Sequence, residues 1–141
     1  MQKTDPRYHA FVTVLTNHLR PAMGCTEPIA IAYAAAVCTK TLGCIPDTVQ
    51  VSVSGNILKN AKAVTVPNTN GQKGIEAACA AGIVAGDAAG ELQVIAQVDE
   101  CQRIAIANYL AQGHITVAVL PNARMFEILV HAIGGGHTAT T

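Results

Sequence analysis

The chain bends sharply at Met23-Gly24-Cys25-Thr26-Glu27-Pro28 and then continues as an alanine-rich segment. Gly24 permits a turn that a side chain would hinder, and Pro28, which lacks an N–H and has a preset φ, suits the first turn of a helix. The pattern predicts a helix over 28–42, with Thr26 as its cap. Because small side chains lie on nearly every side of this helix, neighbouring elements can approach closely and we expect it to be buried.

Cys25 stands directly before this helix, where unpaired N–H groups and the helix dipole favour negative charge. That position should depress the pKa of its thiol and make it a metal ligand or a nucleophile. The alternative is that Cys25 packs as a small apolar residue, as free cysteines commonly do. No CxxC motif or Cys–His pair accompanies it, so its spacing alone favours the packed role.

The composition predicts one domain built on aliphatic packing. Half of the 141 residues are hydrophobic but only two are Phe, three are Tyr and none is Trp, so burial depends on Ala, Val, Ile and Leu. The nine basic and nine acidic residues balance, which leaves no electrostatic footprint for nucleic acid or an anionic membrane. We expect small molecules, or further copies of the chain, as partners.

The sequence predicts a cytoplasmic protein. Its apolar run over 29–38 is interrupted by Thr39 and Lys40, well short of the ~20 residues that span a bilayer. The chain also opens without a basic region followed by a cleavable apolar stretch. In the cytoplasm the cysteines should be thiols or metal ligands rather than disulfides. They are Cys25, Cys38, Cys44, Cys79 and Cys101.

The remaining periodicity predicts an α+β fold, with Ala-rich helices packed on a small sheet in a single domain over 1–141. Helices are expected near 6–20, 28–42, 57–61, 75–84 and in two pieces of 91–110 that divide near Asp99. Strands are expected near 48–54, 64–66, 115–120 and 125–132, the last two forming a hairpin. The inward residues of 91–110 are expected to include Ile104, Ala105 and Ala107. The triple glycine before His137 is expected to be mobile.

A polar loop, Pro67-Asn68-Thr69-Asn70-Gly71-Gln72-Lys73-Gly74, leads directly into the predicted helix over 75–84. Backbone N–H groups at such a helix start form a natural site for a carboxylate or a phosphate. The loop has neither the Walker A spacing nor the G-x-G-x-x-G pattern. Asn, Thr and Gly are also ordinary cap and turn residues, and the residues alone favour that structural role.

The histidines predict no zinc site. His9 and His18 are nine residues apart on one helix and therefore point in different directions, which is typical of surface residues. His131 is expected to be an ordinary strand residue. Its spacing of six from His137 matches no zinc signature.

Three motifs occur in order: Gly24-Cys25-Thr26-Glu27-Pro28 before an alanine-rich helix, Ser54-Gly55-Asn56, and Pro67-Asn68-Thr69-x-Gly71-x-x-Gly74. Together they resemble the L-cysteine desulfidase family of bacteria and archaea, which is related to the catalytic alpha chain of iron-sulfur L-serine dehydratases. The resemblance covers nearly the whole chain, and it changes the expected role of Cys25 from packing to chemistry. Members of that family are about three times as long, so the chain resembles their N-terminal part.

The resemblance implies a lyase with a 4Fe-4S cluster, which removes hydrogen sulfide from L-cysteine by β-elimination and yields pyruvate and ammonia. Cys25 would be one cluster ligand, and the remaining ligands would lie outside this chain. The implied substrate-binding residues are Thr26, Glu27, Asn56, Asn68, Thr69, Gly71 and Gly74. The candidate bases for the α-proton are Lys59, Lys73 and His137.

Two alternatives stay open. An L-serine dehydratase-type deaminase would differ in that iron meets a hydroxyl rather than a thiol on the substrate. The second alternative is a non-catalytic binding or assembly module, which is suggested by the missing cluster ligands and by the small side chains of the helix over 28–42.

Overall fold

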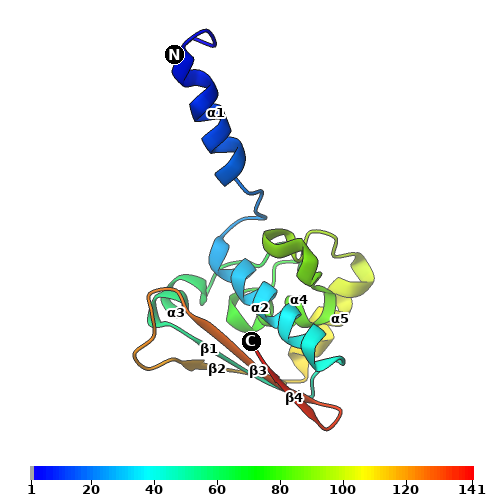
Figure 1. Ribbon diagram of the computed structural model, residues 1–141. Coiled ribbons are helices and arrows are strands. Elements are labelled where there is room, and N and C mark those ends of the chain that lie inside the picture. Colours follow the sequence, from blue (N-terminus) through cyan, green and yellow to red (C-terminus); the bar gives the residue numbers. More distant parts are fainter. Residues whose placement is uncertain (1) are drawn as a thin grey trace.

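The computed structural model describes residues 2–141 and places a four-stranded sheet beneath a layer of helices, with the first helix projecting from this body (Figure 1). The predicted α+β class is confirmed. The helices are α1 (Pro6–His18), α2 (Thr26–Leu42), α3 (Gly55–Ala61), α4 (Gly74–Ala85), the 3-10 helix η1 (Ala88–Gln93) and α5 (Glu100–Ala111). The strands are β1 (Thr48–Val53), β2 (Ile115–Val119), β3 (Ile128–Gly134) and β4 (His137–Thr140).

β1 lies in the middle of the sheet, whose strand order is β2-β1-β3-β4. It pairs in parallel with β2 and antiparallel with β3. The predicted hairpin between 115–120 and 125–132 is therefore wrong, because β1 separates these two segments. Val49, Val51 and Val53 of β1 are buried under the helices, and this apolar face suits the central position in a sheet covered on that side.

The predicted strand over 64–66 is also wrong. Thr65 makes only an isolated bridge with Lys73, and the Gly74 N–H donates to the Val64 carbonyl over 3.1 Å. The segment over 64–66 therefore pairs with the residues at the end of the loop over 67–74. This pairing closes the loop and adds no strand to the sheet.

The triple glycine, expected to be mobile, forms a tight turn. Gly135 and Gly136 adopt φ values of 56° and 78°, which a two-residue hairpin turn requires and glycine adopts without steric cost. The following residues, His137–Thr140, pair antiparallel with β3 as the edge strand β4. The expected mobility of the triple glycine is therefore wrong, and the strand over 137–140 was not predicted.

α2 and α4 pack against each other above the sheet. A methyl group at Gly82 of α4 would overlap the carbonyl oxygen of Ala32 of α2, so the two backbones approach as closely as glycine allows. The predicted burial of the small-residue helix is confirmed along its inner side, and α4 occupies that side. The helix begins two residues before the prediction, at Thr26, because Cys25 and not Thr26 is the cap residue.

α5 follows the predicted division at Asp99, which caps it in a capping box with Gln102. The expectation that Ile104 points inward is wrong, because 56% of its surface is exposed. Ile106 and Tyr109 are buried instead. Two residues correspond to about 200° around a helix, so Ile104 and Ile106 face opposite ways. Ala105 and Ala107 are half-buried.

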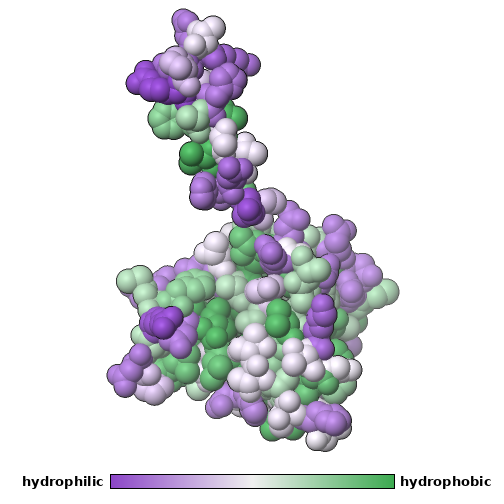
Figure 2. Space-filling model, in the orientation of Figure 1, coloured by the Kyte–Doolittle hydropathy of each residue, from purple (hydrophilic) through white to green (hydrophobic). Residues whose placement is uncertain are grey.

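α1 forms where predicted, with Asp5 as its cap and Pro6 as its first residue. The Asp5 side chain accepts a hydrogen bond from the Arg7 N–H over 2.9 Å. No residue of α1 is buried, so its apolar side meets solvent rather than the body of the protein (Figures 1 and 2). The expected surface positions of His9 and His18 on this helix are confirmed.

Candidate functional site

The turn before α2 presents an exposed thiol within a short chain of hydrogen bonds. Gly24 adopts a φ of 133°, and Cys25 follows as the cap residue of α2. The Cys25 Sγ donates to Glu27 Oε2 over 2.9 Å, and Asn60 Nδ2 donates to Glu27 Oε1 over 3.1 Å. Glu27 therefore links the thiol at the start of α2 to the last turn of α3.

Asn60 is a member of this group that the sequence analysis missed. The motif Ser54-Gly55-Asn56 directed attention to Asn56, which lies on the first turn of α3 and is exposed. Asn60 is four residues later and hence on the same side of a helix. The four-residue spacing from Asn56 was the one sequence signal that could have identified Asn60.

The neighbouring carboxylate decides the acidity of Cys25. The hydrogen bond to Glu27 raises the pKa of the Cys25 thiol above its ordinary value, and some loss of solvation adds to this, while the backbone N–H groups of the turn act against it. The expected depression of this pKa is therefore wrong, since loss of the proton would leave two negative groups in contact. The same hydrogen bond lowers the pKa of Glu27.

Replacing Glu27 with Gln should make Cys25 react faster with iodoacetamide at a fixed pH near 8. Without the carboxylate, the pKa of the thiol falls and a larger fraction is thiolate, which is the reactive form. Mass spectrometry of the Cys25 peptide measures the rate over a range of pH. Glu100→Gln, which removes an exposed carboxylate from the first turn of α5, should leave the Cys25 profile unchanged. An unshifted profile in Glu27→Gln would contradict the dominance of this contact.

The loop over 67–74 is preformed by its own side chains. The Asn68 side-chain nitrogen donates to the carbonyl oxygens of Ile95 and Ala96, at 3.0 and 3.3 Å. Thr69 is 2% exposed, and its hydroxyl donates to the Val66 carbonyl over 2.7 Å. These two predicted substrate-binding side chains are thus engaged in holding the loop, and the polar groups left for a ligand are mainly those of the backbone.

The two predicted glycines of the loop have different surroundings. Gly71, with a φ of 84°, is exposed, and a methyl group there would meet nothing within 4 Å. Gly74, with a φ of 94°, is buried, and a methyl group would lie 3.1 Å from the Lys62 carbonyl oxygen. The positive φ and the close approach of Lys62 therefore require a glycine at position 74, at the start of α4.

The structure brings the loop and the Cys25 turn together. A methyl group on Gly24 would lie 3.6 Å from Cγ of Pro67, the first residue of the loop. On the other side of the loop, Asn70 donates to Glu100 at the start of α5 over 3.2 Å. The Thr26 hydroxyl donates to Glu27 over 3.2 Å, so it too belongs to the turn.

The three candidate bases are dispersed. Lys59 is exposed on α3 directly before Asn60, and Lys73 is exposed at the cap position of α4. His137 begins β4, and a methyl group at Gly135 in the preceding turn would lie 3.4 Å from Sγ of Cys44, just past the other end of α2. The 17 residues of α2 separate that end from Cys25 by roughly 25 Å, at 1.5 Å per residue.

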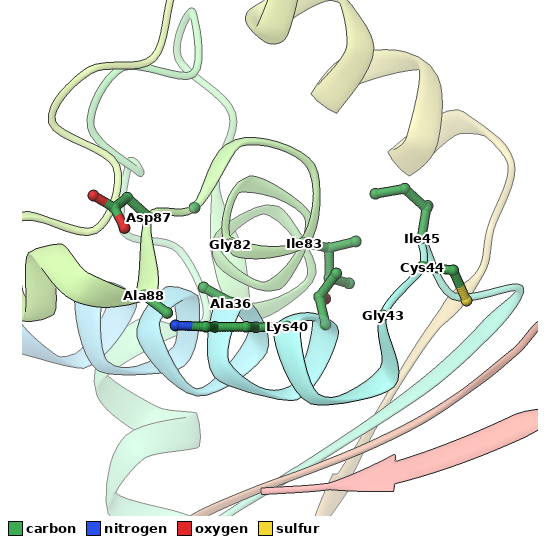
Figure 3. Close-up of a pocket in the computed structure, with 11 residues that line it drawn as sticks. Ala36, Lys40, Gly43, Cys44, Ile45, Gly82, Ile83, Asp87 and Ala88 are labelled. Carbon is green, nitrogen blue, oxygen red and sulfur yellow. The ribbon is translucent and has the colours of Figure 1, made fainter.

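A pocket of about 500 Å³ opens between the C-terminal ends of α2 and α4 (Figure 3). Lys40 extends along it toward Ala88, and the Thr39 hydroxyl at its edge is buried and has no hydrogen-bond partner among the described residues. The Asp87 carboxylate accepts from the Ala89 N–H and so serves as a cap. No motif marks this pocket in the sequence, and α2 separates it from Cys25.

Comparison with known proteins shows many similar chains, among them the following three. One from Treponema denticola is 49% identical over 139 residues, which cover 98% of this chain and 32% of that protein. One from Desulfitobacterium hafniense is 46% identical over 130 residues, covering 92% of this chain and 30% of that protein. One from Oleidesulfovibrio alaskensis is 41% identical over 134 residues, covering 95% and 31%.

These relatives are UPF0597 proteins. The chain spans about a third of the length of the UPF0597 relatives that it matches. Their name states no activity, so the expected L-cysteine desulfidase activity stays a prediction. No family model and no solved structure matches the chain. Among residues 2–141, no helix has the length and apolarity that crossing a membrane requires.

The described residues supply one accessible thiol for an iron–sulfur cluster at this site. Cys38 and Cys79 are buried in the core, where burial raises the pKa of both thiols. Cys44 is half-buried at the other end of α2, and Cys101 is exposed on α5. Within residues 2–141 no three His, Cys, Asp or Glu side chains are grouped to hold a metal. Such clusters are held by several thiolates, so these residues alone do not fit one.

Proposed function

We propose that this chain supplies the Cys25 thiolate and the substrate-orienting groups of an iron–sulfur-dependent β-elimination lyase acting on L-cysteine. The observation that supports it most is the hydrogen-bonded group of Cys25, Glu27 and Asn60 beside the preformed loop over 67–74. The motifs shared with L-cysteine desulfidases support the same reaction. The other cluster ligands would come from polypeptide corresponding to the rest of the UPF0597 relatives' length.

In this proposal Glu27 has two roles, one toward the Cys25 thiol and one toward the substrate. It accepts the hydrogen bond from Cys25, and a thiol must lose its proton when it binds a metal. Glu27 is therefore positioned to take that proton or pass it to water. With the Cys25 thiolate bound to a cluster, the Glu27 carboxylate would be free to accept hydrogen bonds from the ammonium group of an amino acid. Asn60 would fix the orientation of this carboxylate.

The loop over 67–74 is suited to the other charged group of an amino acid, its carboxylate. Its positive-φ residues Asn68, Asn70 and Gly71 present backbone groups ahead of α4, and the N-terminus of a helix favours a carboxylate. A bound cluster would supply a Lewis acid for the leaving sulfur. The three candidate bases stay open: Lys59 is on the same helix as Asn60, Lys73 ends the loop, and His137 begins β4.

A chimera tests this proposal, with this chain replacing the matching third of the Treponema denticola relative. After anaerobic reconstitution with iron and sulfide, L-cysteine should yield pyruvate and hydrogen sulfide in equal amounts, and L-serine should react more slowly. A preference for L-serine would favour the deaminase alternative. Absence of turnover with both amino acids would contradict a lyase.

A further inference from the structure

α1 is an amphipathic helix without a partner in this structure. It has 13 residues, none of them buried. Phe11 and Leu15, one turn apart, are 55% and 54% exposed, and Leu19 continues the same side. An isolated helix of this length is marginal in water, and amphipathic helices gain their stability mainly from packing of the apolar side. The apolar side of α1 is therefore suited to a protein surface.

A second group of exposed apolar side chains lies at the connection between β2 and β3. Val119 ends β2, and Met125 and Phe126 stand in the loop between β2 and β3, with Met125 80% exposed. The Ser54 hydroxyl donates to the Met125 carbonyl over 2.9 Å, which fastens this loop to the point where β1 passes into α3. The loop therefore lies beside the first turn of α3, and the last turn of the same helix contacts Glu27 next to the Cys25 turn.

We propose that α1 and the apolar group at Val119, Met125 and Phe126 form a docking surface for the polypeptide that makes up the other two-thirds of the UPF0597 relatives. The match to the Treponema denticola relative covers 98% of this chain, so it includes α1, while 32% of that protein is covered. The longer protein therefore carries both this surface and a large further segment. Aromatic residues and methionine, such as Phe11, Met125 and Phe126, are enriched where protein interfaces are buried.

The docked segment would also complete the neighbourhood of Cys25. The Cys25 turn follows α1 in the chain, and α3 links it to the loop that carries Met125. The described residues offer no second accessible thiol on this turn. A polypeptide seated on both apolar groups would lie near the turn and bring further thiolates to it. Only this last step rests on the proposed function. The docking itself rests on the exposed apolar residues and on the relatives' length.

Co-expression tests the docking without iron. The 141-residue chain, carrying an affinity tag, is produced together with the part of the Treponema denticola relative outside the match, and purified in the presence of a chelator. The untagged polypeptide should co-purify in a one-to-one complex. The double variant Phe11→Asp, Leu15→Asp should recover at least about tenfold less of it, because each aspartate would bury a charge at the interface. Phe126→Asp should reduce recovery in the same direction.

Ile104→Asp is the matched control, because Ile104 is equally exposed on a helix, α5, away from both apolar groups. It should co-purify as well as the unchanged chain. Circular dichroism and thermal melting of the α1 variant should match the unchanged chain, since α1 contributes no buried residue.

Three results would overturn the proposal. They are failure of the unchanged chain to co-purify, equal recovery with the α1 variant, and self-association of the chain alone that the α1 variant abolishes. The last would assign the surface to a second copy. Since the experiment excludes iron and measures no turnover, its failure is distinct from failure of the lyase assay.

Discussion

Gly82→Ala should lower the free energy of unfolding by about 3 kcal/mol, the upper part of the usual range for overpacking a core. The added methyl group would overlap the carbonyl oxygen of Ala32 and lie 2.8 Å from its carbonyl carbon. Both atoms belong to the backbone of α2, which cannot rotate away as a side chain can. α2 and α4 must therefore move apart, and the contacts on both sides of this pair weaken.

Urea denaturation and thermal melting measure this effect, and the melting temperature should fall by roughly 10 °C. Gly90→Ala is the matched control. A methyl group there would meet only Cβ of Gln93, at 4.0 Å, so stability should change by no more than about 0.5 kcal/mol. If Gly82→Ala has the same melting temperature as Gly90→Ala, the spacing of α2 and α4 does not depend on Gly82.

Cys25→Ser in the chimera should reduce the release of hydrogen sulfide from L-cysteine to background while the fold survives. A serine hydroxyl is a harder and much less acidic donor than a thiol, so it replaces a thiolate poorly as an iron ligand. Cys25 is exposed and contributes no core packing. Circular dichroism should therefore be unchanged, and a loss of helix in this variant would show that the cysteine has a structural role instead.

Glu27→Gln should behave differently in the same chimera. The amide can still form the hydrogen bond with Asn60, but it cannot take a proton or pair with a substrate ammonium. Iron should be retained while turnover falls, as expected when a positioning group is lost. Loss of iron in this variant would instead place Glu27 among the groups that hold the cluster.

The parts of the fold that were predictable depend on signals within a few residues. Asp5-Pro6 and Asp99 mark helix starts, and Gly43, with a φ of 82°, ends α2 where expected. The alternation over 48–53 places three valines on one side of β1, and that side is buried. Caps and periodicity act locally, so the sequence carries them directly.

The pairing of the strands was not predictable from such signals. β1 joins β2 and β3, which lie more than sixty residues later in the chain. The short spacing of 115–120 and 125–132 favours a local hairpin, but β1 pairs with both segments and lies between them. Likewise the burial of Ile106 rather than Ile104 depends on how α5 rotates against α4, which neither residue specifies alone.

The candidate site likewise has features that the sequence predicts and features that it does not. The exposed turn at Cys25 and the loop over 67–74 could be found from glycine, proline and cap residues. The acidity of Cys25 could not, because the general effect of a helix N-terminus is outweighed by the side chain of Glu27 turning back onto the thiol. Asn60 joins the group only because α3 folds against the start of α2.

The iron bound per chain is the most direct test of the account, whose central claim is that Cys25 holds an iron–sulfur cluster. The unchanged chimera, Cys25→Ser and Cys44→Ser are reconstituted side by side without oxygen. Cys44, half-buried at the other end of α2, is the matched control. We expect about four irons per chain in the unchanged chimera and in Cys44→Ser, and little or none in Cys25→Ser. Equal iron in all three proteins would contradict it and return Cys25 to the role of an ordinary surface cysteine.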